Sequence, residues 1–90
     1  MLAVRIFISG TVQGVCFRRF VQTLANNQNI KGWCRNLDDG RVEIVTEGDK
    51  TVIDKFIEQI KNGPPLSSVN DVKIVREPRI TGFSSFEIKK

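Results

Sequence analysis

The sequence contains no histidine and no tyrosine. Histidine is the usual general base near neutral pH, a member of every Ser-His-Asp triad and a ligand in most catalytic zinc sites. Chemistry that depends on an imidazole is therefore excluded. If the chain is an enzyme, its substrate must react without one.

Cysteine is scarce and long apolar runs are missing. Cys16 and Cys34 are too few and too far apart for a CxxC zinc site or a framework of disulfides. No run approaches the ~18 apolar residues that cross a membrane, and Arg5 interrupts the first apolar stretch before a signal-peptide core could form. We therefore expect a cytoplasmic protein with no membrane partner and with reduced thiols, a Cys16–Cys34 disulfide being the alternative.

The net charge is positive but modest. Fourteen Lys and Arg against ten Asp and Glu give +4 and a pI near 9.4. A mild positive potential suits an anionic small molecule, and it also suits a nucleic acid. Because no long block of like charges occurs, a solvated basic surface is the simplest interpretation.

The length of 90 residues, about 10.2 kDa, is enough for one domain, which we expect to span residues 1–90. Hydrophobic periodicity predicts its elements. Within residues 3–9, Val4, Ile6 and Ile8 alternate with Arg5 and Ser9, as is typical of a strand, and Phe7 packs on its second face. Two later stretches repeat the i, i+3, i+4, i+7 spacing of an amphipathic helix. They are Phe17, Phe20, Val21 and Leu24, and Ile53, Phe56, Ile57 and Ile60.

Turn residues separate the remaining elements. Strands at 30–37 and 41–47 flank Asp38-Asp39-Gly40, a hairpin turn because Asp and Gly tolerate positive φ. Asp49 is placed to cap the second helix, and Gly63-Pro64-Pro65 ends it. Two further strands are indicated by apolar residues, which are Val69, Val72, Ile74 and Val75, and then Phe83, Phe86 and Ile88.

The order β-α-β-β-α-β, plus a short extra strand, predicts an α+β fold of the ferredoxin-like, split βαβ type. In that arrangement an antiparallel sheet carries both helices on one face. The fold hosts many functions, so the chemistry has to be sought in particular residues.

The segment from Gly10 to Arg18 joins the first strand to the first helix. A glycine-containing loop at this position can point several backbone N–H groups into one concavity, and the helix N-terminus adds partial positive charge. Arg18, in the first helical turn, could grip a phosphate held there through two oxygens. The alternative is a plain loop with a surface arginine. Arg19 lies about 100° away around the helix, so we expect it on the solvated face.

A second candidate is Gly32-Trp33-Cys34-Arg35-Asn36, where the second strand ends. Gly32, Cys34 and Asn36 share one face of that strand. An asparagine at this place can hold a water with its carbonyl oxygen while its NH2 group donates to an oxyanion. The alternative is that Asn36 opens the following turn.

Both segments carry a resemblance to a known family. Gly10 to Arg18 resembles the first signature of the acylphosphatases, G-x-V-Q-G-V-x-F-R, without a gap. Gly32 to Asn36, followed by Asp39-Gly40-Arg41-Val42-Glu43, is similar to the second signature, G-W-V-x-N with D-G-x-V-E. Cys34 replaces the valine that is more common there.

The resemblance implies hydrolysis of the carboxyl-phosphate bond of small acyl phosphates, giving carboxylate and inorganic phosphate. It implies a phosphate cradle and two catalytic residues, Arg18 to grip the phosphate and Asn36 to position the attacking water. The cradle comprises Gln13, Gly14, Val15, Cys16, Phe17 and Arg18.

A free-standing, monomeric acylphosphatase without metal or cofactor is the function we expect. The carboxylate leaving group has a conjugate acid with a pKa near 4, so no general acid is required. One rival is an RNA-binding module of the same fold, but the strand at 41–47 carries no aromatic residue for base stacking. The other rival is a non-catalytic relative of the kind fused into carbamoyl-transferring maturation proteins, and the presence of Arg18 and Asn36 favours the enzyme.

Overall fold

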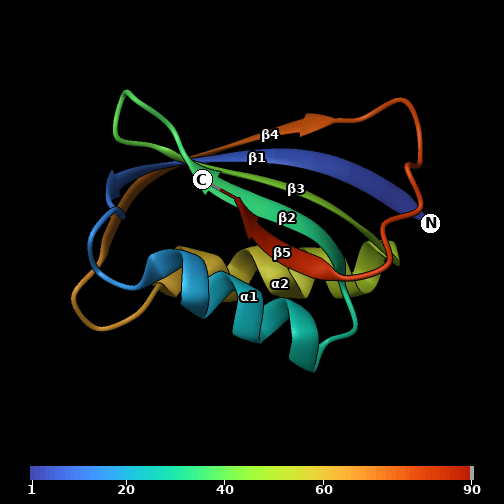
Figure 1. Cartoon of the computed structure of the whole chain (residues 1–90), viewed down its shortest axis with the longest axis horizontal. Coiled ribbons are helices and arrows are strands. Elements are labelled where there is room, and N and C mark those ends of the chain that lie inside the picture. The colour runs from blue at the N-terminus through green and yellow to red at the C-terminus, as the bar shows by residue number, and fades with distance from the viewer. Residues whose placement is uncertain (90) are drawn as a thin grey trace.

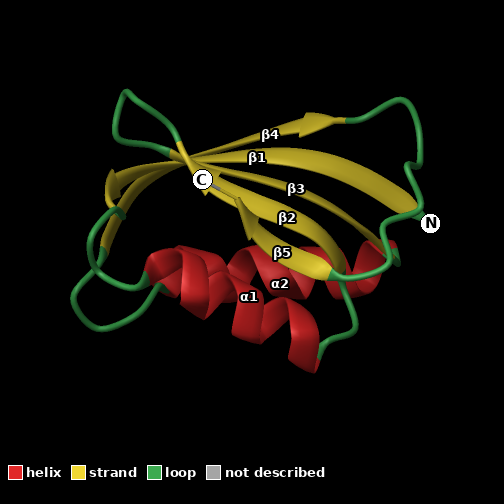
Figure 2. Ribbon diagram, viewed as in Figure 1, coloured by secondary structure: helices red, strands yellow, loops and turns green. Residues whose placement is uncertain are grey.

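The elements follow one another in the expected order. The computed structural model describes residues 1–89, and both helices cover the same face of its sheet (Figures 1 and 2). The elements are β1 (Leu2–Thr11), α1 (Phe17–Asn27), β2 (Lys31–Asn36), β3 (Val42–Gly48), α2 (Lys50–Asn62), β4 (Ser68–Arg76) and β5 (Phe86–Lys89). The α+β, ferredoxin-like prediction is confirmed. Within the described residues, no helix is long and apolar enough to cross a membrane.

The sheet differs from the prediction in one respect. Its strand order is β4-β1-β3-β2-β5, and the first four strands pair antiparallel, but β5 pairs parallel with β2, so the sheet is mixed. The reason lies in residues 77–85, which carry the chain from one edge of the sheet to the other along a single end (Figure 1). A connection that stays at one end reverses the direction of the chain, and the direction opposite to β4 is that of β2.

The core lies between the sheet and the helices. Val4, Ile6 and Ile8 are buried on the helix-covered face of β1, as their alternation predicted. All four apolar positions predicted for α2 are buried. In α1 the fully buried residues are Phe17, Val21 and Ala25, whereas Phe20 and Leu24 are only partly buried. These three buried residues are spaced four apart, so the buried stripe runs closer to the Arg18 side of α1 than predicted.

Several ends of elements also differ. β1 continues through Gly10 and Thr11, which pair with Val69 and Ser68 after a shift of register. Asp49 takes the N-cap position of α2, but its side chain makes no capping hydrogen bond. Phe83 lies in the loop before β5 instead of in a strand, because its N–H donates to the buried Glu47 carboxylate at 3.2 Å.

Candidate active site

The loop between β1 and α1 contains two residues in the left-handed backbone region, separated by one residue. Gly14 has φ 75° and Cys16 has φ 61°, and Cys16 and Asn29 are the only described non-glycine residues with positive φ. Alternation of left- and right-handed residues turns successive N–H groups toward one side. An L residue in the left-handed region costs about 1–2 kcal/mol, so the surrounding structure must hold Cys16 there.

The first turn of α1 breaks the usual charge preference of a helix. Cys16 is its N-cap residue without a side-chain capping bond, and no acidic residue stands in the first turn. Arg18 and Arg19 occupy that turn instead. The N-terminus already carries partial positive charge, so each cation is unfavourable there until an anion binds nearby.

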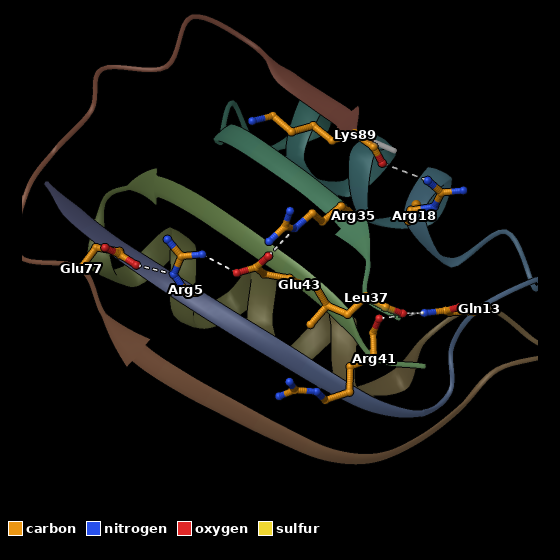
Figure 3. A network of polar contacts seen from close by, with 9 residues as sticks. All are labelled: Arg5, Gln13, Arg18, Arg35, Leu37, Arg41, Glu43, Glu77 and Lys89. Atoms are coloured by element: carbon orange, nitrogen blue, oxygen red, sulfur yellow. Dashed lines mark hydrogen bonds and ion pairs between the residues drawn. The ribbon is translucent and has the colours of Figure 1, made fainter. Parts of the chain in front are cut away.

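Arg18 is half-buried and held by the end of β5. Its Nη1 donates to the carbonyl oxygen of Lys89 at 3.1 Å (Figure 3). The parallel pairing of β5 with β2 brings this carbonyl beside α1. The Arg18 guanidinium is therefore held by a residue near the C-terminal end of the chain, far from the loop in sequence.

Asn36 does not build the turn that follows it. The turn is closed by backbone bonds from Leu37 N–H to Arg41 O (2.8 Å) and from Gly40 N–H to Leu37 O (3.2 Å), and the Asp39 carboxylate accepts the Arg41 N–H. The Oδ1 atom of Asn36 is buried without a hydrogen-bond partner among the described residues. A buried acceptor without a partner costs about 1–3 kcal/mol, so this oxygen is poised to accept a hydrogen bond.

A depression of about 420 Å³ brings the two motifs together. Of the predicted site residues, Gly14, Cys16, Phe17, Arg18 and Asn36 line it. Gln13 and Val15 do not belong to this lining, whose other members are Val12, Arg19 and Ile88. Arg19 is exposed, as predicted, yet it borders the depression. Ile88 carried no local sequence signal, because its position depends on where β5 joins the sheet.

Gln13 joins the loop to the β2–β3 hairpin. Its Nε2 donates to Leu37 O at 2.8 Å and to Arg41 O at 2.9 Å (Figure 3). Val15, the other predicted loop residue outside the lining, packs against the hydrophobic core. The side chains of both residues therefore hold the loop in place, whereas Gly14 between them lines the depression.

The strand that carries Asn36, β2, packs closely on its neighbour β3. A Cβ on Gly32 would lie 1.9 Å from the Val45 carbonyl oxygen, which explains the glycine of the second motif.

Both cysteines are free, and the buried Cys34 thiol lies 3.8 Å from the Arg18 carbonyl oxygen. Burial raises the pKa of Cys34 to about 12, an effect that the Arg18 charge only partly offsets, so the thiol stays protonated.

The sheet face without helices carries an ion-pair network. The buried Glu43 carboxylate pairs with Arg5 and with Arg35, the latter at 2.6 Å, and Arg5 also pairs with Glu77 at 2.6 Å (Figure 3). Burial alone would raise the pKa of Glu43, but the hydrogen bonds and charges of Arg35 and Arg5 outweigh it and lower the pKa. This network is separated from the depression by the sheet.

Fold and site together define a class of protein. It is a small α+β domain in which a strand-to-helix loop borders a depression together with an arginine and an asparagine. The family model that matches this chain, over residues 4–88, is Acylphosphatase.

Individual relatives agree with the family model. The acylphosphatase of Bacillus subtilis is 44% identical over 88 residues, covering 98% of this chain and 97% of that protein. The crystal structure of acylphosphatase from Bacillus subtilis superposes with a TM-score of 0.97 at 43% identity, covering all of both chains. The chain therefore belongs to the acylphosphatase family, and it is an enzyme that hydrolyses acyl phosphates.

A domain of a much longer protein also resembles this chain. HypF from T. kodakarensis matches this chain with a TM-score of 0.87 at 35% identity, but the match covers only 12% of that protein. The Bacillus subtilis enzyme, in contrast, is matched over nearly its whole length.

Proposed function

We propose that the depression binds the phosphate of a small acyl phosphate and that Asn36 delivers the attacking water. The backbone N–H groups of residues 13–18 and the Arg18 guanidinium hold the phosphate oxygens, and Asn36 Oδ1 accepts a hydrogen bond from the water. The observation that carries this proposal is the buried, unpartnered Oδ1 of Asn36 in the same depression as Arg18.

The reaction is a displacement at phosphorus. The water oxygen forms a bond to phosphorus, the bond between phosphorus and the acyl oxygen breaks, and the carboxylate leaves with the bonding electron pair. Positioning and stabilisation of the charge on the equatorial oxygens supply most of what phosphoryl transfer needs. Preorganised amides and one guanidinium provide both.

Two further features of the proposal concern acid-base and metal chemistry. The leaving carboxylate needs no proton, and the proton of the water passes to a phosphate oxygen of the substrate, so no side-chain base is required. Among residues 1–89, those that line the depression include no carboxylate, and carboxylate oxygens are the protein ligands that Mg²⁺ prefers. We therefore propose catalysis without metal or cofactor.

Substitution of the two residues separates their roles. Arg18→Ala should lower kcat for benzoyl phosphate by about 10²–10³-fold, as loss of one preorganised donor does elsewhere, and should also weaken competitive inhibition by inorganic phosphate. Asn36→Ala should lower kcat while the inhibition constant of phosphate changes little, because Asn36 contacts water and not phosphate.

The matched control is Arg76→Ala, which removes an exposed cation at the end of β4. All assays are run with EDTA present. Activity that disappears in EDTA and returns with Mg²⁺ would refute catalysis without metal. Equal losses of phosphate binding in the Arg18 and Asn36 variants would refute the division of roles.

The open sheet face supports the absence of a nucleic-acid partner. It carries two aromatic rings, Phe7 on β1 and Trp33 on β2, although β3 contributes none. Arg35 and Lys89 lie over the Trp33 ring at 5.4 and 4.4 Å, and Arg41 lies over Phe7 at 4.8 Å. Since these rings are covered by side chains, base stacking on them would require those contacts to break.

Three broader features complete the proposal. Residues 1–90 act as one domain, and the enzyme acts as a monomer, since the residues that the proposed mechanism uses are brought together within a single copy of the chain and a second copy is not required. The compartment is the cytoplasm, where thiols such as Cys16 and Cys34 stay reduced.

A further inference from the structure

The depression is larger than a phosphate cradle requires. Its volume of about 420 Å³ falls in the range of roughly 300–1,000 Å³ that holds whole small molecules. Beyond the loop, Arg18 and Asn36, it is bordered by Arg19 and Ile88. These two residues, which the proposed hydrolysis does not use, surround space that the acyl group of a substrate can occupy.

The helix geometry places Arg19 at the exposed edge of the α1 surface that faces β5. Gln22 Nε2 donates to the Phe86 carbonyl oxygen of β5 at 3.2 Å, which fixes the rotation of the helix. Residues three apart lie about 60° apart around a helix, so Arg19 projects on the same side as Gln22 and beyond it. Ile88, two residues after Phe86, is 37% exposed and forms an apolar wall of the same space.

The charge of Arg19 is not used within the described residues. Arg5, Arg35 and Arg41 each form an ion pair with a carboxylate, whereas Arg19 has neither an ion pair nor a side-chain hydrogen bond to any residue between 1 and 89. It remains exposed at the rim of the depression. A cation there attracts a second anionic group on the substrate, at a distance from the phosphate that Arg18 holds.

We propose that Arg19 selects acyl phosphates whose acyl group carries a terminal carboxylate, with Ile88 contacting the apolar carbons between the two charged ends. This inference rests on the proposed placement of the phosphate beside Arg18. It makes Arg19 a specificity residue for one class of substrate, the monophosphates of dicarboxylic acids.

The test compares matched substrates. Benzoyl phosphate is compared with 3-carboxybenzoyl and 4-carboxybenzoyl phosphate, which differ from it only by a carboxylate on the ring. For the isomer that reaches Arg19, the wild-type enzyme should show kcat/KM about two- to fivefold above benzoyl phosphate, as expected for an exposed ion pair. Arg19→Gln should abolish this preference, Arg19→Glu should reverse it, and Arg19→Lys should retain part of it.

The controls isolate the ion pair. Lys55→Gln removes the same charge from an exposed position on α2 and should leave the preference intact. In about 1 M salt, where the Debye length falls to about 3 Å, the wild-type preference should shrink. Thermal unfolding of each variant checks that it is folded.

Different results would refute the role of Arg19 and the proposed mechanism of hydrolysis. The inference is overturned if neither carboxylated substrate is preferred, if Arg19→Gln leaves the preference unchanged, or if Lys55→Gln lowers it equally. If wild-type protein does not hydrolyse benzoyl phosphate, or if Arg18→Ala is fully active, the proposed mechanism fails instead.

Discussion

Replacing Gln13 by alanine tests whether the loop and the hairpin act as one site. The change removes two hydrogen bonds, of 2.8 and 2.9 Å, to the carbonyl oxygens of Leu37 and Arg41. Both oxygens keep a backbone partner, because Leu37 O also accepts from Gly40 N–H and Arg41 O from Leu37 N–H. The loss should therefore be about 0.5–1.5 kcal/mol for each bond, or about 1–3 kcal/mol in the free energy of unfolding.

The Gln13→Ala substitution should also lower kcat. Without Gln13 the hairpin that carries Asn36 is no longer tied to the loop, so the water is held less accurately relative to the phosphate. Loss of about 1.4 kcal/mol of this positioning lowers kcat about tenfold. The inhibition constant of inorganic phosphate should change less, because the backbone groups of residues 14–17 and Arg18 remain.

Two measurements and one matched variant check this reasoning. Urea unfolding followed by the fluorescence of Trp33, the only tryptophan, gives the stability, and steady-state hydrolysis of benzoyl phosphate gives kcat. Gln13→Glu keeps the size of the side chain but replaces both N–H donors by an acceptor facing two carbonyl oxygens. It should be at least as damaging as Gln13→Ala. Wild-type stability and kcat in the glutamate variant would refute a role for the donated hydrogen bonds.

Two predictions concern ionisable groups. Glu43→Gln should destabilise the protein at pH 7 by about 1–3 kcal/mol, because Arg5 and Arg35 lose their shared carboxylate but remain partly in contact with water. Because the pKa of Glu43 is lowered by folding, its contribution is present above about pH 4.3 and is lost at lower pH. The stability gap between wild type and variant should thus narrow between pH 7 and pH 3.5 in urea unfolding, and a constant gap would contradict this. In a thiol titration of native protein, the exposed Cys16 should react quickly and Cys34 only as fast as the protein unfolds, since burial raises its pKa to about 12. Rapid reaction of both thiols would refute the protected state of Cys34.

The sequence predicted those elements whose local pattern agrees with their tertiary surroundings. In α2 the four apolar positions, the preceding Asp49 and the terminal Gly63 all indicate the helix that is observed. The parallel pairing of β5 could not be read from its four residues, because it depends on the path of residues 77–85. Phe83 was wrongly assigned to a strand for a similar reason: the carboxylate that binds its N–H, Glu47, is distant in sequence.

The candidate site, too, could be predicted only in part from the sequence. The nine-residue motif from Gly10 to Arg18 indicates the loop and the arginine, and the structure brings both beside Asn36. The contacts that hold them there are long-range. Arg18 is fixed by the Lys89 carbonyl, and the side chain of Gln13 binds two carbonyls of the hairpin. No periodicity or spacing near Gln13 or Arg18 encodes these partners.

Three features that are unfavourable in free energy lie around one depression, and one explanation accounts for all three. Cys16 adopts a left-handed conformation, the first turn of α1 carries cations where a helix favours anions, and Asn36 Oδ1 is buried without a partner. α2 also begins with a cation, Lys50, but its N-cap residue is the acidic Asp49 and only one cation stands in its first turn. A phosphate bound in the loop would offset the first two costs, through the loop N–H groups and the helix N-terminus, and a water beside it would satisfy the third. These departures from local preference therefore indicate a site built for an anion and a water together, which is what hydrolysis of an acyl phosphate without an imidazole requires.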